Sequence, residues 1–139
     1  MERNIIFHIN ETKLYEDLIL MEGIYPVLFT CIDDFGNTYL SVCYRADGIK
    51  TCWLLAKTNP EKIIDLLSNK VTIRELFESD ELWSIRSIKD EENMYVEKIE
   101  DYRLFDPAAF PAEGEYLDAD NGEFVKEISV LQQRLSGHP

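Results

Sequence analysis

Carboxylates and aromatic side chains are closely interleaved in one part of this sequence, between residues 80 and 118. Such a mixture can form a protein contact surface, because aromatic side chains anchor interfaces and charges steer the approach of a partner. The same aromatic side chains can instead be core residues, with the acids forming a solvated face. If the mixture is exposed, the residues expected to contact a partner are Trp83, Glu91, Glu92, Tyr95, Glu97, Glu100 and Tyr102.

The negative charge of the chain is concentrated in the same region. The sequence has 14 basic and 27 acidic residues, which gives a net charge of −13. Residues 75–123 hold 16 acids and four bases, a net charge of −12, whereas residues 1–74 carry only −2. A nucleic-acid binder needs a basic patch to neutralise phosphates, so this charge argues against direct nucleic-acid binding.

A basic protein is the partner that this charge favours. Carboxylates on one face of a strand repeat at about 6.6 to 7 Å. This spacing is comparable with that of successive phosphates on a nucleic-acid strand, so a nuclease is one such partner.

Three cysteines, Cys31, Cys43 and Cys52, match the spacing of no zinc or redox motif. The Asp47-Gly48 dipeptide predicts a two-residue hairpin turn, which would place Cys43 directly opposite Cys52. A disulfide can just form between residues paired in this way. Reduced cysteines in the core are nevertheless the expectation for a cytoplasmic chain.

The other polar clusters fit no metal or catalytic motif. Residues 118–122 resemble the start of a calcium loop, but the glycine is at position 5 instead of 6, and Ser129 replaces the required glutamate. Asp33 and Asp34 lie in a stretch that is typical of a turn. No glycine motif for phosphate is present. We therefore expect no cofactor or metal and assign no catalytic residue, while an enzyme that uses scattered carboxylates stays open.

The length of 139 residues matches one domain, so residues 1–139 are expected to form a single α+β domain. A hydrophobic content of 45% is ordinary for a globular protein with a buried core. The sequence has no run of about 18 apolar residues, and its start lacks the pattern of a secretory signal. These features predict a cytoplasmic protein with no membrane span.

Strand and turn signals predict most of the sheet. Residues 27–32, 38–44 and 49–56 are β-rich runs separated by turn residues, which predicts an antiparallel β-meander. Both faces of these strands are apolar, so we expect the sheet to be covered on both sides or curled around a core. Residues 82–89 and 94–100 predict a second hairpin.

Capping residues predict three helices. Asn59, followed by a proline and an acid, predicts the start of a short helix. Thr72 and Glu75 form a capping-box pattern, which predicts a second short helix. A C-terminal helix is expected to begin near Asp120, with Glu123 completing its capping box.

Three segments complete the expected fold. Residues 5–9 are strand-like, and residues 14–21 fit either a helix or an extension of the sheet. Residues 101–119 are expected to be irregular because two prolines and a glycine interrupt them. The expected fold is therefore α+β, an antiparallel β-meander sheet packed by two short helices and a C-terminal helix.

Four short motifs within residues 14–78 carry a resemblance. They are Tyr25-Pro26-Val27-Leu28-Phe29, Gly36-Asn37-Thr38-Tyr39-Leu40, Asn59-Pro60-Glu61-Lys62-Ile63 and Ile73-Arg74-Glu75-Leu76-Phe77. In these motifs the chain is similar to a group of uncharacterised small bacterial proteins of unknown function. The resemblance implies a bacterial origin and transfers no activity or catalytic residue.

These observations lead to two functional hypotheses. The first is a non-enzymatic acidic protein-interaction module, such as an immunity protein, an antitoxin-like partner or a phage-type inhibitor, that binds a basic protein through a negative surface. The alternative is a small-ligand-binding or enzymatic domain with a pocket between sheet and helices. An exposed patch of acids and aromatics would favour the first, and a pocket with convergent polar groups the second. The oligomeric state stays open.

Overall fold

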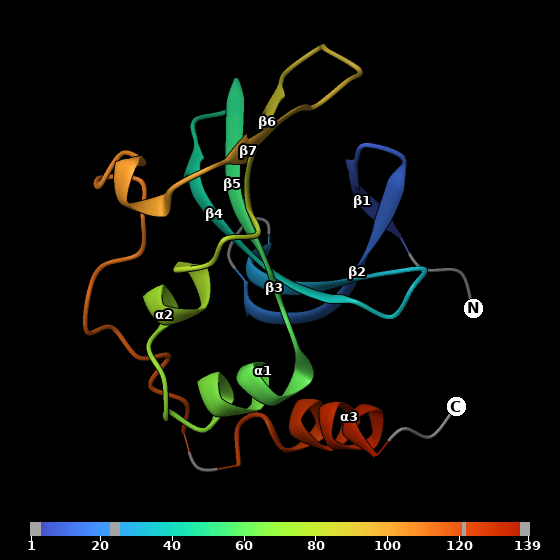
Figure 1. Cartoon of the computed structure of the whole chain (residues 1–139), viewed down its shortest axis with the longest axis vertical. Coiled ribbons are helices and arrows are strands. Elements are labelled where there is room, and N and C mark those ends of the chain that lie inside the picture. The colour runs from blue at the N-terminus through green and yellow to red at the C-terminus, as the bar shows by residue number, and fades with distance from the viewer. Residues whose placement is uncertain (1–3, 23–25, 121, 137–139) are drawn as a thin grey trace.

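The computed structural model describes residues 4–22, 26–120 and 122–136 as an α+β fold (Figure 1). The described part contains seven strands, three α-helices and one 3-10 turn. In chain order the elements are β1 (Ile5–Ile9), β2 (Thr12–Glu22), β3 (Pro26–Asp33), β4 (Thr38–Ala46), β5 (Lys50–Thr58), α1 (Pro60–Leu67), α2 (Ile73–Phe77), β6 (Leu82–Ile88), β7 (Tyr95–Ile99), η1 (Tyr102–Leu104) and α3 (Val125–Leu135).

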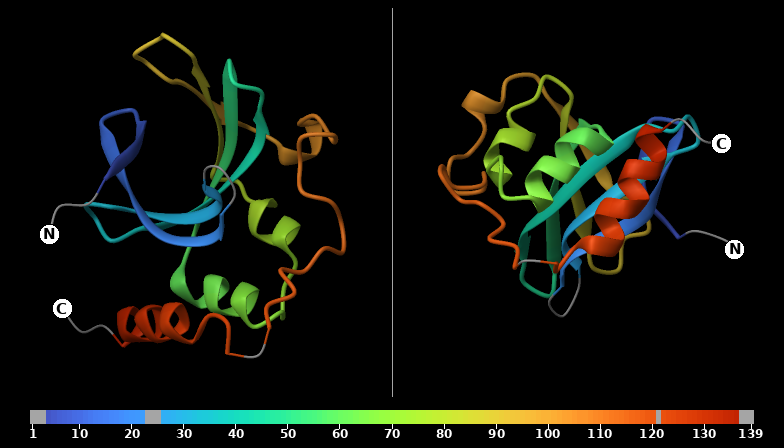
Figure 2. Two further views of the ribbon diagram at one scale, coloured as in Figure 1. Left: turned by 180° about the vertical axis from the view of Figure 1, so that it is seen from behind. Right: turned by 90° about the horizontal axis from the view of Figure 1, so that it is seen from below.

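All seven strands form one antiparallel sheet in the order β1-β2-β3-β4-β5-β6-β7. The predicted three-stranded meander is its centre, and the predicted second hairpin is β6–β7, which continues the same sheet. The ambiguous segment, residues 14–21, lies in strand β2. The sheet curls until it is nearly a barrel, which goes beyond the expected meander sheet (Figure 2).

The curl separates two apolar cores because neighbouring residues of a strand point to opposite faces. Leu55 of β5 packs in the inner core with Phe7, Phe29 and Ile85, inside the curled sheet. Its neighbour Leu54 packs in the outer core, which the helices cover. The sheet is therefore both curled around one core and covered on its outer face by a second.

The first two helices begin at the predicted caps. The Asn59 side chain accepts a hydrogen bond of 2.9 Å from the amide of Lys62 at the start of α1. At α2, the amide of Glu75 donates to the Thr72 hydroxyl, and the Glu75 carboxylate accepts from the amide of Thr72. Both predictions are confirmed.

The C-terminal helix begins later than predicted. Helix α3 starts at Val125, and its N-cap, Phe124, makes no capping hydrogen bond through its side chain. Glu123 does accept a hydrogen bond from the amide of Asp120, but these residues form a turn before the helix. The physical reason is Gly122, whose φ of 83° is in the left-handed region and cannot continue a right-handed helix.

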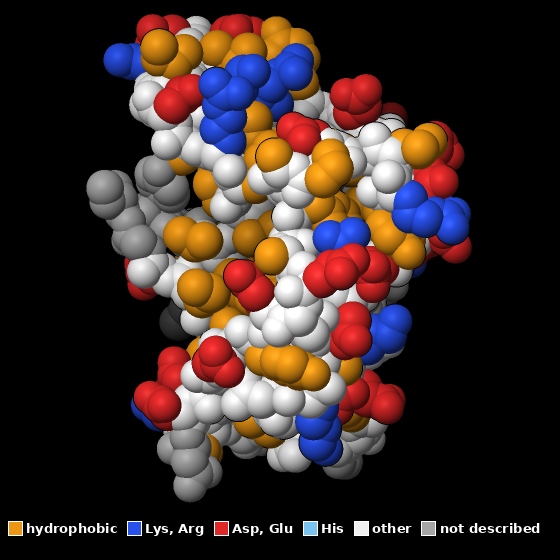
Figure 3. All heavy atoms as spheres, turned by 90° about the vertical axis from the view of Figure 1, so that its left-hand side faces the viewer, with side chains coloured by type: hydrophobic (Ala, Val, Ile, Leu, Met, Phe, Trp, Pro, Cys, Tyr) orange, Lys and Arg blue, Asp and Glu red, His pale blue; other side chains and the backbone are white. Residues whose placement is uncertain are grey.

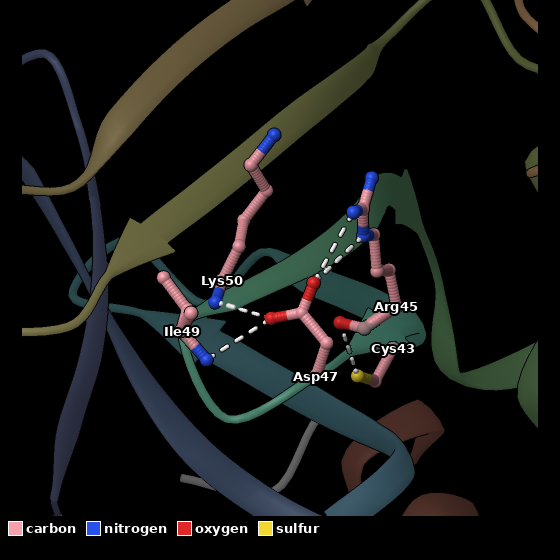
Figure 4. A network of polar contacts seen from close by, with 5 residues as sticks. All are labelled: Cys43, Arg45, Asp47, Ile49 and Lys50. Atoms are coloured by element: carbon pink, nitrogen blue, oxygen red, sulfur yellow. Dashed lines mark hydrogen bonds and ion pairs between the residues drawn. The ribbon is translucent and has the colours of Figure 1, made fainter.

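The β4–β5 connection is wider than the predicted two-residue turn. Ala46 pairs with Thr51, and the Asp47 amide donates to the carbonyl of Lys50. The Asp47 carboxylate accepts hydrogen bonds from the amides of Ile49 (3.0 Å) and Lys50 (2.8 Å), as Figure 4 shows. These bonds stabilise a connection of four residues, 47–50, between the paired residues Ala46 and Thr51.

A β-bulge between Cys43 and Arg45 shifts the pairing of β4 and β5. Cys43 consequently pairs with Trp53, while Cys52 pairs with Arg45. The prediction that Cys43 lies directly opposite Cys52 is therefore wrong, because a bulge places one extra residue on one strand. All three cysteines are free thiols, and Cys31 and Cys52 are buried.

The segment between β7 and α3 is irregular apart from η1, as predicted. Hydrogen bonds fix it to the helical region, among them one from the Arg74 side chain of α2 to the carbonyl of Pro111 and two between Asn69, just after α1, and Ala119. Helix α3 then packs against α1 (Figure 2, right). Within the described residues, no helix is long and apolar enough to cross a membrane.

Candidate protein-contact surface

The β6–β7 hairpin presents one face to the inner core and the other to the outside. Ile85 belongs to the inner core and pairs with Val96 of β7, so Val96 faces inward. The flanking pairs, Arg86 with Tyr95 and Ser84 with Glu97, lie on the opposite, outer face. The outer face of β7 therefore carries an aromatic side chain and a carboxylate two residues apart.

Tyr95 is held between two charged side chains. Its hydroxyl donates a hydrogen bond of 2.5 Å to a carboxylate oxygen of Glu91, and the Arg86 guanidinium carbon lies 4.8 Å from the centre of its ring. The hydrogen bond and the charge of Glu91 raise the pKa of Tyr95, so the phenol stays neutral. Although 46% exposed, the ring is thus fixed in one orientation.

Exposed carboxylates lie along the same hairpin and at its end. Glu91, Glu92, Glu97 and Glu100 are all exposed. A shallow hollow of about 260 Å³ lies beside them, bordered by acidic residues and by Leu104, which is 85% exposed. We define the hairpin surface as Arg86, Glu91, Glu92, Tyr95, Glu97, Glu100 and Leu104.

Two predicted contact residues lie elsewhere. Trp83 is half-buried on the inner face, with the Lys98 ammonium 5.3 Å from the centre of its ring. Tyr102 is half-buried and stacks on Phe110, at a distance of 5.9 Å between ring centres, in the outer core. The structure brings the four glutamates and Tyr95 to one hairpin and its end. Trp83 and Tyr102 lie apart from this group.

The hairpin surface includes two residues that the sequence did not single out, Arg86 and Leu104. The register of β6 and β7 places Arg86 against Tyr95, and no local sequence signal fixes that register. Leu104 occupies the 3-10 turn that follows the strand. A large apolar side chain among acids and prolines was the one available signal for it.

The surface is not uniformly negative. Figure 3 shows acidic side chains spread among hydrophobic ones, with a group of lysines and arginines at the end of the molecule where the β4–β5 and β6–β7 turns lie. Near these turns, Arg45 of β4 forms an ion pair with Asp47, and the Arg86 guanidinium of β6 packs over the ring of Tyr95. The surface is therefore acidic overall, with positive groups interspersed.

Asp33, one of the two adjacent acids that the sequence places in a turn, has a structural role there. Its buried carboxylate accepts four hydrogen bonds of 2.9 Å, from the amides of Phe35 and Asn37, the Asn37 side chain and the Tyr39 hydroxyl. Burial opposes ionisation of this carboxyl, but the hydrogen bonds outweigh it and lower the pKa of Asp33. This is the expected turn chemistry. Among the described residues, no three His, Cys, Asp or Glu side chains are grouped as a metal site.

A small pocket lies between the sheet and the segments that cover its outer face. Its volume is about 250 Å³, and its walls include Leu28, Val42 and Tyr44 from the sheet and Ile73 and Phe110 from the covering segments. The lining is mostly apolar, with Glu115 as its one carboxylate. The pocket matches the alternative hypothesis in position and lacks a convergent set of buried polar groups.

Comparison of the chain with models of protein families, with curated proteins and with solved structures found no match. The similarity of residues 14–78 to small bacterial proteins stays a prediction.

Proposed function

We propose that this chain is a non-enzymatic acidic interaction module that binds a basic protein partner, such as a nuclease, through the hairpin surface. The observation that carries the proposal is Tyr95, an exposed aromatic side chain fixed by Glu91 and Arg86 on a strand flanked by carboxylates. A rigid aromatic side chain loses little entropy on binding and serves as an anchor. The surrounding carboxylates steer a cationic partner toward it. An inhibitor, an immunity protein or an antitoxin-like partner in the cytoplasm would act in this way.

The proposal is tested by capture with two baits. One bait is the wild-type chain, and the other has Glu91, Glu92, Glu97 and Glu100 changed to lysine. Basic proteins from an extract of the native host should be enriched on the wild-type bait at low salt. They should be released as salt shortens the Debye length from about 14 Å to about 4 Å, because screening weakens contacts between exposed charges.

A matched control separates a specific surface from total charge. Changing four exposed acids outside the hairpin surface to lysine alters the net charge by the same amount and should leave binding nearly unchanged. These acids are Glu22, Glu61, Glu113 and Asp118. The association rate of a captured partner should fall by about tenfold or more in the hairpin variant alone. Equal capture on both baits would contradict the proposal.

The second candidate is binding of a small apolar ligand in the 250 Å³ pocket, and its lining of aliphatic and aromatic side chains favours it. Ala109 borders this pocket, so Ala109→Trp would fill it. Binding of a small apolar probe such as benzene, observed by NMR shifts of the pocket residues and lost in Ala109→Trp, would support this candidate. Equal shifts in both proteins would exclude it.

A further inference from the structure

The curled sheet ends in two edge strands that border a groove. In the part of the chain that the structure describes, β1 pairs only with β2, and β7 pairs only with β6. The hairpins that contain these edges stand opposite each other on the open side of the sheet (Figure 1; Figure 2, left). A cavity of about 720 Å³ lies between them, lined by residues of β1, by Asn10, by residues 92–94 and by Val96.

The groove extends beyond this cavity. A second cavity of about 310 Å³ is lined by Trp83 and Lys98, and both cavities are bordered by Asn10 and Val96. The two cavities therefore follow the inner side of β7 along the strand. The larger one is within the range of about 300 to 1,000 Å³ that is typical of ligand sites.

Strand direction limits what can fill this groove. Each strand is antiparallel to the next, so β1 and β7 run in the same direction. Direct pairing between β1 and β7 would therefore be parallel. One additional strand that runs the opposite way makes antiparallel ladders with both edges and completes an eight-stranded barrel. The outward N–H and C=O groups of an edge strand are a template for such a strand.

The side chains of β7 and of Met94, just before it, define what the additional strand must carry. Met94 and Val96, which are 40% and 38% exposed, line the groove. Tyr95 and Glu97 lie on the other face of the same strand. Side chains directly opposite on neighbouring strands are about 4.5 to 5.5 Å apart. An occupant with apolar residues toward the groove and basic residues beside Tyr95 and Glu97 satisfies both faces.

The charge near β7 also favours a basic occupant. Residues 90–101 contain six acids and one base, Lys98. The Lys98 ammonium already donates to the carbonyl of Asp80 and lies over the ring of Trp83. Glu92 and His8 line the groove itself. Lysine or arginine in the occupant therefore meets an excess of carboxylates.

We propose that the groove between β1 and β7 binds one extended segment of the basic partner by β-strand addition, with apolar and basic residues alternating along that segment. In this mode, main-chain hydrogen bonds supply affinity and alternate side chains supply specificity. The inference rests on the proposed function for the charge of the occupant, and it adds the way in which the partner is recognised.

The probe for this test is a capped peptide of eight residues in which valine and lysine alternate. Its binding is measured by calorimetry, and amide hydrogen exchange is followed in Ile5–Ile9 and Tyr95–Ile99. Saturation with the peptide should slow exchange of the outward-facing amides of both strands by about tenfold or more, because they become hydrogen-bonded. A peptide of four valines followed by four lysines, and an N-methylated form of the alternating peptide, should bind at least about tenfold more weakly.

Two matched variants locate the site. Val96→Lys places a charge in the groove and should weaken peptide binding by about tenfold or more. Val125→Lys makes the same change at a position on α3 that is 63% exposed, and it should stay within about twofold of wild type. Circular dichroism confirms that both variants are folded.

Several outcomes would overturn this inference. They are peptide binding without protection of β7, equal binding by Val96→Lys, and equal binding by the N-methylated peptide. A dimer that protects β7 without peptide would assign the groove to a second copy of the chain. If a native partner depends on the carboxylates of the hairpin surface but not on Val96, the proposed function stands and strand addition fails. If neither the carboxylate changes nor Val96→Lys weakens binding of the partner, both the proposed function and strand addition are wrong.

Discussion

Arg134 of α3 forms a two-bond ion pair with Asp17 of β2, a residue 117 positions earlier in the chain. The distances are 2.7 Å from Nη1 to Oδ2 and 2.8 Å from Nη2 to Oδ1. The side chain of Asp17 is only 6% exposed, and its Oδ2 also accepts a hydrogen bond from the Thr30 hydroxyl. This pair fastens the C-terminal helix to the outer face of the sheet.

The first prediction concerns this ion pair. Arg134→Ala should lower the free energy of unfolding by about 2 kcal/mol, because it removes two charge-assisted hydrogen bonds from a mostly buried carboxylate. Arg45→Ala is the control, since Arg45 and Asp47 form a pair in which both side chains are largely exposed, and it should cost less than about 1 kcal/mol. Urea titrations measure both values. Equal losses would show that the Arg134 pair contributes no more than a surface contact.

Leu66 and Leu131 face the outer core from α1 and α3, and both are 0% exposed, as the helical spacing predicts. Replacing either with alanine should lower the free energy of unfolding by about 2 to 5 kcal/mol, because a cavity remains in the core. Leu135→Ala is the control on the same helix as Leu131, because Leu135 is 50% exposed. A loss in the control as large as that in Leu131→Ala would contradict the assigned helix face.

The lowered pKa of Asp33 predicts how the free energy of unfolding changes in acid. Its pKa in the folded protein is lower than the usual value of about 3.9. The carboxylate therefore stabilises the fold above about pH 4, and this contribution is lost as the pH falls through its folded pKa. Asp33→Asn removes the titration, so stability should fall less steeply between about pH 4 and pH 2 than in wild type. Urea titrations at several pH values measure this slope, and an equal slope in Asp33→Asn and wild type would contradict the prediction.

The three thiols should differ in reactivity. Cys43 is half-buried, whereas Cys31 and Cys52 are buried, and burial raises the pKa of Cys31 more strongly than that of Cys43. A thiolate is needed for reaction, so a disulfide reagent should modify Cys43 first. In denaturant all three should react, and the intact mass should match three free thiols. A Cys43→Ser variant that keeps the fast phase, or a native mass two daltons lower, would contradict this prediction.

The amino-acid sequence by itself determined the elements whose signals are local. The cap at Asn59 and the capping box of Thr72 and Glu75 depend on hydrogen bonds that span three residues, and both are where the sequence places them. Alternating β-rich runs and turns likewise located the strands, because side-chain period and turn chemistry are read over a few residues. The acidic composition around β7 is also a property of the sequence.

Only the tertiary structure decided how these elements meet. The bulge between Cys43 and Arg45 shifted the register of a hairpin that the turn dipeptide alone did not specify. Trp83 was separated from Tyr95 because register and curl assign a strand residue to one face or the other. The pairing of Arg134 with Asp17 and the groove between β1 and β7 join segments far apart in the chain. Such contacts depend on how the whole sheet packs, and no short stretch of sequence contains that information.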